Sequence, residues 1–189
     1  MDTDIKAQTV GMLFPKKTED TVKNILKFNP IGVRYGNANI SYERYLGGCR
    51  SITVGASTSS SIFLKPRVET TFAANMGIRQ YLSKKKGPLE GMYLETQLTF
   101  SNSRYDYNSD WSTGSFYSYR SKAMDVGANF LVGKQVISRK GLTLDLYTGL
   151  GVKYSVMNSQ TFTQSGSSKS YYEGPSLHIP LGLKIGFGW

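Results

Sequence analysis

The sequence predicts an all-β protein, and specifically an eight-stranded antiparallel up-and-down transmembrane β-barrel. In the last residues, PSLHIPLGLKIGFGW (175–189), every second side chain from Leu177 to Trp189 is apolar, with small or polar residues between them. Because successive side chains of a strand point to opposite faces, this segment has one apolar face. Similar alternation recurs along the chain, whereas the 3.6-residue period of a helix does not.

Composition restricts how such a chain can cross a membrane. The 189 residues suit one domain, and they include 13% aromatic residues and 20 glycines. A spanning helix needs about 20 consecutive apolar residues, and the apolar runs here are only a few residues long. A barrel strand needs about 9–11 residues, of which only half are apolar. We therefore expect strands rather than helices to span the membrane.

The strands are assigned in chain order from this alternation. We expect residues 1–21 to form a flexible leader and residues 22–189 to form the barrel. Strands are predicted at 22–29, 38–46, 51–59, 68–82, 91–103, 119–137, 142–157 and 175–189. Their apolar faces begin with Leu26 and Phe28, Ile40 and Tyr42, Ile52 and Val54, Phe72 and Met76, Met92 and Leu98, Met124 and Phe130, and Leu142 and Leu144. Glycine-containing turns at 47–50 and 138–141 separate neighbouring strands.

The lengths of the connections support a barrel with both ends of the chain on one side. Those at 47–50, 83–90 and 138–141 are short, and those at 60–67, 104–118 and 158–174 are longer. Outer-membrane barrels have short periplasmic turns, longer external loops and an even number of strands. This pattern predicts periplasmic termini, with a short first external connection at 30–37 as the exception.

The face opposite the apolar one distinguishes a membrane barrel from a soluble one. A soluble barrel presents charged residues outside, whereas this face carries small residues such as Gly149, Gly151, Gly182 and Gly186. Small side chains suit the crowded interior of an eight-stranded barrel. We therefore place the apolar face against lipid and the small face in the lumen.

Charged residues of both signs share the predicted luminal face. They are Glu43, Arg79, Glu95, Asp125, Asp145, Lys153 and Lys184. Because unpaired buried charge is costly, we expect a luminal network of ion pairs and hydrogen bonds. The network could be a structural plug or a path for protons or ions. Pro180 faces the same lumen and removes one hydrogen bond of the strand ladder.

Charge, cysteine and histidine content argue against other classes. The net charge is +10, but the basic residues are scattered and no nucleic-acid-binding motif gathers them. Cys49 is the one cysteine and His178 the one histidine, so we expect no intramolecular disulfide, no metal site and no cofactor. MDTDIKAQTVG (1–11) lacks the apolar core of a signal peptide. We expect a targeting segment to have been removed from an exported chain.

Three segments carry a resemblance to known proteins: NILKFNPIGVRYGNANISYERYL, MGIRQYLSKKKGPLEGMYLE and GPSLHIPLGLKIGFGW. They resemble a family of small outer-membrane β-barrels of unknown function that is common in Bacteroidetes. The general architecture also resembles the OmpA- and OmpX-type barrels. The resemblance implies a multi-pass protein of the bacterial outer membrane. It also implies that the outer-membrane assembly machinery recognises the last strand, where Phe187 and Trp189 match. It brings no ligand and no reaction.

The leading functional hypothesis is a non-enzymatic outer-membrane protein whose external loops contact lipid, lipopolysaccharide or envelope proteins. Trp111, Phe116 and Tyr117 are the candidate binding residues, because binding residues often lie on loops held by a rigid scaffold. The loops at 104–118 and 158–174 could equally be solvated connectors. The alternatives are a lipid A-modifying enzyme that uses His178 and Ser176, a soluble lipocalin-like ligand-binding barrel, and a small pore. An enzyme of that kind also needs a positioned carboxylate.

Overall fold

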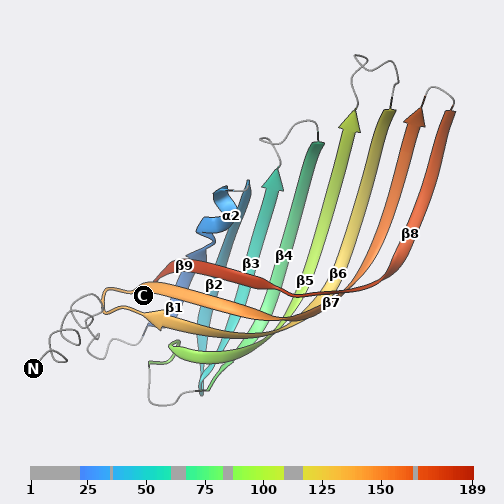
Figure 1. The fold of residues 1–189 in the computed structure, drawn as a ribbon. Coiled ribbons are helices and arrows are strands. Elements are labelled where there is room, and N and C mark those ends of the chain that lie inside the picture. The colour runs from blue at the N-terminus through green and yellow to red at the C-terminus, as the bar shows by residue number, and fades with distance from the viewer. Residues whose placement is uncertain (1–21, 35, 61–66, 83–86, 109–116, 164–165) are drawn as a thin grey trace, which may run out of the picture.

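The computed structural model describes residues 22–34, 36–60, 67–82, 87–108, 117–163 and 166–189. The elements within these ranges are labelled in Figure 1: β1 (Asn24–Phe28), α2 (Pro30–Arg34), β2 (Asn37–Gly47), β3 (Arg50–Ser60), β4 (Arg67–Tyr81), β5 (Gly91–Asn108), β6 (Tyr117–Ile137), β7 (Leu142–Thr163), β8 (Gly166–His178) and β9 (Leu181–Gly188). In this described part, no helix has the length and apolar character needed to cross a membrane.

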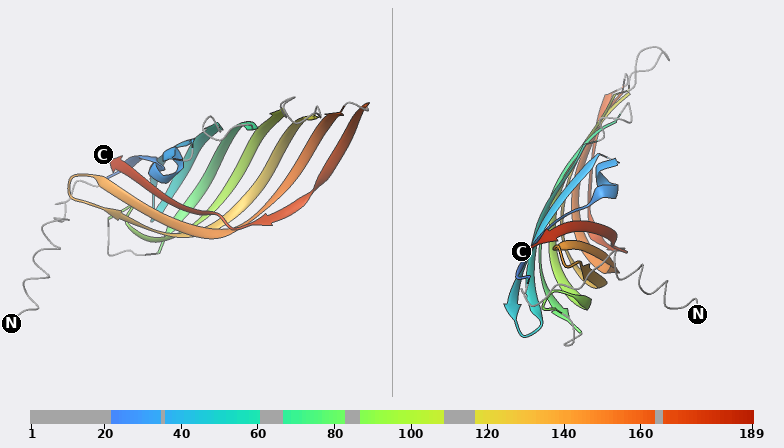
Figure 2. Two further views of the ribbon diagram at one scale, coloured as in Figure 1. Left: turned by 45° about the horizontal axis from the view of Figure 1, so that its top comes forward. Right: turned by 90° about the vertical axis from the view of Figure 1, so that its left-hand side faces the viewer.

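Antiparallel strands close into a ring, which confirms the predicted fold class. Strands β1 to β7 pair in sequence order, and β9 pairs with both β7 and β1. The end of the chain is held at this closure, because the backbone N–H groups of Lys23 and Asn24 both donate to the carbonyl oxygen of Trp189. The ring therefore contains eight strands, with the start of β1 and the end of β9 side by side (Figures 1 and 2).

The predicted last strand, 175–189, is interrupted at Ile179 and Pro180. Gly151 of β7 pairs with His178 of β8, and Thr148 of β7 pairs with Leu181 of β9. Between these two pairs, β7 is counted back by three residues and the last part of the chain is counted forward by three. Strand β9 therefore continues β8 in the same register. The interruption coincides with the proline, which has no N–H to donate to a ladder.

The first strand is short because the chain turns into α2 directly after it. The side-chain oxygen of Asn29 accepts hydrogen bonds from the backbone N–H groups of Ile31 and Gly32, both at 3.0 Å. Asn29 is therefore the N-cap, and Pro30 occupies the first helical position, where its missing N–H is tolerated. Consequently β1 pairs with β9 only from Ile25 to Phe28. The sequence patterning did not predict this five-residue helix.

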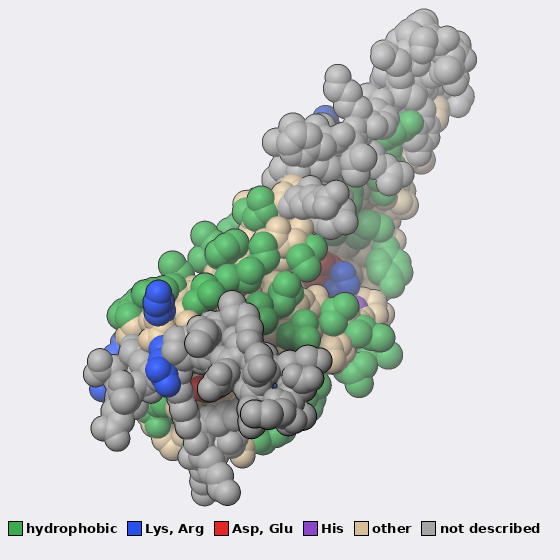
Figure 3. Space-filling view, turned by 60° about the vertical axis from the view of Figure 1, so that its left-hand side comes forward, with side chains coloured by type: hydrophobic (Ala, Val, Ile, Leu, Met, Phe, Trp, Pro, Cys, Tyr) green, Lys and Arg blue, Asp and Glu red, His purple; other side chains and the backbone are tan. Residues whose placement is uncertain are grey.

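Apolar side chains cover the outside of the ring. On β7 the outward residues from Leu142 to Tyr154 are all apolar except Thr148, and they are exposed. At a rise of about 3.3 Å per residue and a tilt of about 45°, such a segment spans roughly 28 Å, which is close to the apolar band of outer-membrane barrels. Figure 3 shows hydrophobic side chains covering much of one face. We call this surface the outward apolar belt.

Glycines on the inner face make room for tyrosine rings from neighbouring strands. A Cβ atom added at Gly133 would collide with the ring of Tyr93, and one added at Gly182 would collide with the ring of Tyr147. The rings therefore lie directly over the glycine backbones, which explains why small residues alternate with apolar ones along these strands. The tight turn after β2 has a different requirement, because Gly47, Gly48 and Cys49 adopt positive φ angles.

An apolar cluster fills the barrel at the end where the termini lie. Val22, Ile25, Tyr81, Leu89 and Tyr93 form it, each at most 6% exposed. Leu89 belongs to the connection between β4 and β5, which was predicted to be only a charged turn. This connection instead sends one leucine into the lumen.

Two segments that were predicted as loops contain parts of strands. The segment predicted as a loop at 104–118 contributes the end of β5, to Asn108, and the beginning of β6, from Tyr117. The segment at 158–174 forms most of a hairpin, in which β7 continues to Thr163 and β8 begins at Gly166. These stretches are rich in Ser, Thr and Tyr and lack apolar alternation, so the sequence pattern did not show that their strands continue beyond the outward apolar belt.

The outward apolar belt makes a prediction about Ala128, which lies on its β6 portion between Val126 and Phe130. Replacing Ala128 by arginine places a charge at the level of the belt, which costs about 2–4 kcal/mol at the midplane of a bilayer. We expect Ala128→Arg to lower the free energy of unfolding by that amount in urea titrations in phospholipid vesicles. Ala128→Leu is the control and should be neutral or stabilising. Equal stability of the two variants would contradict a lipid-facing belt.

Candidate functional site

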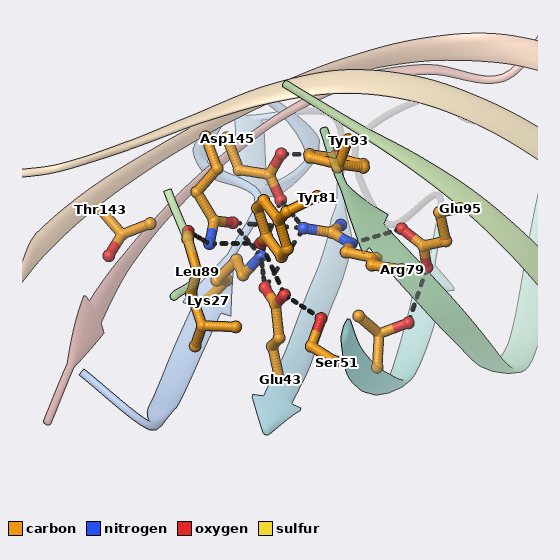
Figure 4. Close-up of polar contacts among 12 residues, drawn as sticks. Lys27, Glu43, Ser51, Arg79, Tyr81, Leu89, Tyr93, Glu95, Thr143 and Asp145 are labelled. Carbon is orange, nitrogen blue, oxygen red and sulfur yellow. Dashed lines mark hydrogen bonds and ion pairs between the residues drawn. The ribbon is translucent and has the colours of Figure 1, made fainter. Parts of the chain in front are cut away.

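A buried group of charged and polar side chains lies inside the barrel, beside the apolar cluster (Figure 4). Its members are Lys27 of β1, Glu43 of β2, Ser51 and Thr53 of β3, Arg79 and Tyr81 of β4, Tyr93 and Glu95 of β5, Gln135 of β6, and Asp145 of β7. Each is at most 5% exposed. We call this group the luminal network. It joins seven of the eight strands of the ring through side chains.

Two cations organise the luminal network. The Nζ of Lys27 lies 2.6 Å from Glu43 Oε2 and 2.7 Å from Asp145 Oδ2. The guanidinium of Arg79 contacts the same two carboxylates, through Nη1 at 3.2 Å and 2.9 Å. Its Nε donates to Glu95 Oε2 at 2.6 Å. Arg79 therefore contacts three carboxylates on three different strands.

Uncharged groups satisfy the remaining oxygens of these carboxylates. The hydroxyl of Tyr81 donates to Glu43 at 2.7 Å, and that of Tyr93 donates to Asp145 at 2.6 Å. Thr53 donates to Glu95 at 2.6 Å. The Gln135 carbonyl accepts from Lys27 at 2.5 Å. A buried ion pair is tolerated when its geometry is good and its other polar atoms are bonded, and both conditions hold here.

Lys184 of β9 is the third cation at this level. It is 6% exposed and pairs in register with Asp145. Its ammonium lies 5.3 Å from the centre of the Tyr147 ring, within the range of a cation–π contact. With Lys27 and Arg79 it gives three positive charges against the three carboxylates. The charge inside this part of the barrel therefore sums to zero.

The other two predicted luminal charges form a separate pair farther from the termini. Lys153 Nζ lies 3.4 Å from Asp125 Oδ2, which also accepts a hydrogen bond from Ser101 at 2.9 Å. Both residues line a cavity of about 800 Å³ on the inner face of β5 to β8. The structure thus brings Glu43, Arg79, Glu95 and Asp145 together and places Asp125 and Lys153 apart from them.

The residues considered for catalysis do not assemble with an acid. The buried Nδ1 of His178 and Oγ of Ser176 have no hydrogen-bond partner in the described ranges. Asp125, the carboxylate of the nearby cavity, is bonded to Ser101 and Lys153 instead. Within the same ranges, no group of three or more His, Cys, Asp or Glu side chains is arranged to hold a metal ion.

The residues assigned to assembly and to loop binding lie elsewhere. Phe187 points outward on β9, where it pairs in register with Leu26 and Leu142, and Trp189 ends the chain beside Asn24. Trp111 and Phe116 lie outside the described residues. Tyr117 is the first residue of β6, and its side chain is likewise outside the description.

Several members of the luminal network were not predicted from the sequence. Lys27 could have been found, because Leu26 and Phe28 were placed on the outer face and the residue between them must point inward. Gln135 could have been found in the same way, because Lys134 and Val136 occupy outward positions of the predicted strand and the residue between them must point inward. The same alternation applies to Tyr93, which lies between the outward Met92 and Leu94, and to Tyr81, which lies two residues after the inward Arg79.

The fold resembles outer-membrane β-barrels of known structure. The translocator domain of the autotransporter NalP from Neisseria meningitidis matches with a TM-score of 0.52 and 11% identity, covering 96% of this chain and 67% of that chain. A major outer membrane protein from Thermus thermophilus matches with a TM-score of 0.46 and 13% identity, covering 90% of this chain and 100% of that chain. No protein-family model and no curated protein matches the sequence. The NalP match establishes an outer-membrane barrel fold.

The luminal network predicts a large effect of neutralising Arg79. Arg79→Met leaves Glu43, Glu95 and Asp145 without their shared cation, and breaking a buried pair in this way costs about 3–5 kcal/mol. We expect a corresponding loss in the free energy of unfolding, measured by urea titration of the refolded barrel. Arg120→Met breaks an exposed pair with Asp106 and should cost at most about 1 kcal/mol.

A double variant keeps this prediction testable if Arg79→Met alone does not fold. Arg79→Met combined with Glu95→Gln removes one cation and one carboxylate together and should recover part of the lost stability. If Arg79→Met and Arg120→Met are equally mild, the luminal network does not hold the strands together.

Proposed function

We propose that this protein is an integral, non-enzymatic protein of the bacterial outer membrane. The single observation that carries this proposal is the distribution of side chains across the barrel wall. Apolar residues face outward around the ring, while the ion-paired Lys27, Glu43, Arg79, Glu95 and Asp145 are buried inside. A soluble barrel requires the opposite arrangement, with an apolar interior and a charged exterior.

The end of the barrel opposite the termini faces the cell exterior in this proposal. The last residues of β3, β5 and β7 and the first residues of β4, β6 and β8 lie at that end (Figure 1). The turns after β2 and β6 and the last residues of β4 lie at the end with Trp189. Short periplasmic turns and extended external segments are the usual arrangement in outer-membrane barrels.

Basic side chains next to the outward apolar belt support contact with lipopolysaccharide. On β5, Arg104 follows Phe100 along the outward face; on β6, Arg120 and Lys122 precede Met124. Asp106 pairs with both arginines, at 2.7 Å and 2.9 Å, and leaves the group with excess positive charge. A lipid surface whose headgroups carry phosphate complements this charge.

The luminal network also bears on conduction. The apolar cluster formed with Leu89 lies at the end with the termini, and the luminal network lies beside it, so side chains fill that half of the lumen. Eight-stranded barrels of this kind are just wide enough for side chains to fill. We therefore propose that the barrel is a scaffold for its external segments and not a pore.

Membrane placement is tested by expressing the chain behind a bacterial export signal and separating the cell envelope from the soluble fraction. We expect the protein in the outer-membrane fraction, where it should migrate faster on gels before boiling than after, because a closed barrel resists unfolding by detergent. Recovery as a soluble periplasmic protein without detergent would overturn the proposal.

Conduction is tested in planar lipid bilayers with the purified, refolded barrel. We expect no stable current steps, because the luminal network and the apolar cluster obstruct the lumen. Reproducible single-channel steps from the unmodified protein would show an open path.

The enzyme alternative has its own test. The lipid A of expressing cells is compared by mass spectrometry with that of control cells, and a modification lost in His178→Ala would favour the enzyme alternative.

A further inference from the structure

The cavity beyond the luminal network is open on one side of the barrel. Strand β8 pairs with β7 along one edge, and no strand of the described ranges pairs with its other edge. The strand that would occupy this place, β1, ends at Phe28, where the chain turns into α2. Figures 1 and 2 show β8 at the margin of the sheet, separated from α2 and β2. The wall therefore has a lateral opening beside β8.

One of two prolines near this edge makes it less suited to pairing with another strand. Pro175 and Pro180 lie five positions apart, so their backbones face opposite sides of the strand and one of them removes a donor from the open edge. Prolines on exposed edges are a common protection against strand addition. The opening is therefore suited to a ligand that does not extend the sheet.

The rim of the opening is apolar and unusually exposed. Leu177, Ile179 and Leu181 are 87%, 73% and 76% exposed, and Leu150 on the adjacent β7 is 71% exposed. Leu98, on a strand paired on both sides, is 61% exposed. The apolar rim leads from the outside of the barrel to the edge of the cavity, because Ser176 and Tyr172 on the same strand line the cavity.

Buried polar atoms in and near the cavity have no hydrogen-bond partner in the described ranges. Ser121 is 1% exposed and lines the cavity, and its Oγ has no hydrogen-bond partner in the described ranges; the same holds for the buried Oγ of Ser176. Nearby, Asn129 and His178 converge over Gly151, and Asn129 Oδ1 and His178 Nδ1 also lack partners there. Leaving several buried polar atoms unpaired is costly, so this arrangement points to a hydrogen-bonding ligand.

The chemistry of the lining selects the kind of headgroup. Asp125 is paired with Lys153 at 3.4 Å, and Asp106 is paired with Arg104 and Arg120, so the lining has no unpaired charge to bind an ionic headgroup. Four tyrosines contribute rings and hydroxyls: Tyr105, Tyr107, Tyr119 and Tyr172. Hydroxyl groups both donate and accept hydrogen bonds, as the serine, amide and imidazole groups require.

We propose that the cavity binds an uncharged amphiphile with a hydroxyl-rich, sugar-like headgroup, and that its alkyl chain leaves the barrel sideways over Leu177, Ile179 and Leu181. The headgroup bonds to Ser176, Asn129 and His178, which lie within two positions of one another in the register of β6, β7 and β8. Ser121 lies six positions farther along β6, about 20 Å away, and is outside the reach of this headgroup. This inference rests on the proposed membrane placement only for the source of the ligand, which is the surrounding lipid layer. Binding itself is measured in micelles and stands or falls independently of where the protein resides in the cell.

The test uses native mass spectrometry of the full chain refolded in an oligo-oxyethylene detergent. Dodecyl maltoside is the probe, maltose is the same headgroup without a tail, and dodecyl tetraoxyethylene is the same tail without a sugar. We expect one bound dodecyl maltoside per barrel, with at least tenfold weaker binding of the other two. Equal binding of maltose would show a site for free sugar, and equal binding of dodecyl tetraoxyethylene would show adhesion of tails only. Either result, or no binding of dodecyl maltoside, overturns the proposal.

Matched variants locate the binding. Asn129→Leu with Ser176→Val should weaken dodecyl maltoside binding at least tenfold, whereas Ser41→Val should not, although Ser41 Oγ is also buried without a partner in the described part of the chain. Leu177→Asn should weaken binding, whereas Leu98→Asn on β5 should not. Heat-modified gel mobility confirms that each variant is folded. Equal losses in the control variants overturn the assignment of the cavity.

Discussion

The contact of one guanidinium with three carboxylates is the interaction on which the closed barrel depends. Arg79 bonds Glu43, Asp145 and Glu95, and Lys27 bonds the first two of these again. Because these groups lie on five strands, separating any of those strands from the ring leaves charge unpaired in a low-dielectric interior. A buried network of this kind adds little net stability compared with a well-packed apolar core, but it penalises incorrect closure strongly. We therefore expect its main contribution to be fixing the register and the order of the strands.

The luminal network also explains why the two halves of the barrel differ. At the end with the termini, β1 and β9 complete the ring, and the apolar cluster and the luminal network fill it. Farther from Trp189, β1 has ended, β8 is paired on one side only among the residues that the structure describes, and the interior becomes a cavity of about 800 Å³. In our proposals, the half with the luminal network holds the barrel together and the open-sided half binds a ligand.

The types of residue on the outside of the barrel are those that suit a lipid environment. Aliphatic and aromatic residues alternate with inward residues along each strand, and basic residues such as Arg104 and Arg120 begin where the outward apolar belt ends. Hydrocarbon excludes charge, and the headgroup region attracts positive charge. The same chain therefore carries its charges in two places, inside as balanced pairs and outside beyond the belt.

The sequence by itself determined the fold class, the phase of the strands and the inward position of residues such as Glu43, Arg79 and Asp145. This was possible because the two-residue period of a strand is a local property that survives in the printed chain. It did not determine the extension of β5 to β8 beyond the belt, where both faces meet polar surroundings and the alternation disappears. It also did not determine which inward charges meet: Asp125 and Lys153 pair apart from the luminal network because their heights in the barrel depend on the stagger between strands. The inserted Leu89, the short β1 and the opening beside β8 were decided by tertiary structure alone, since they arise where a connection or a strand end meets residues far away in the chain.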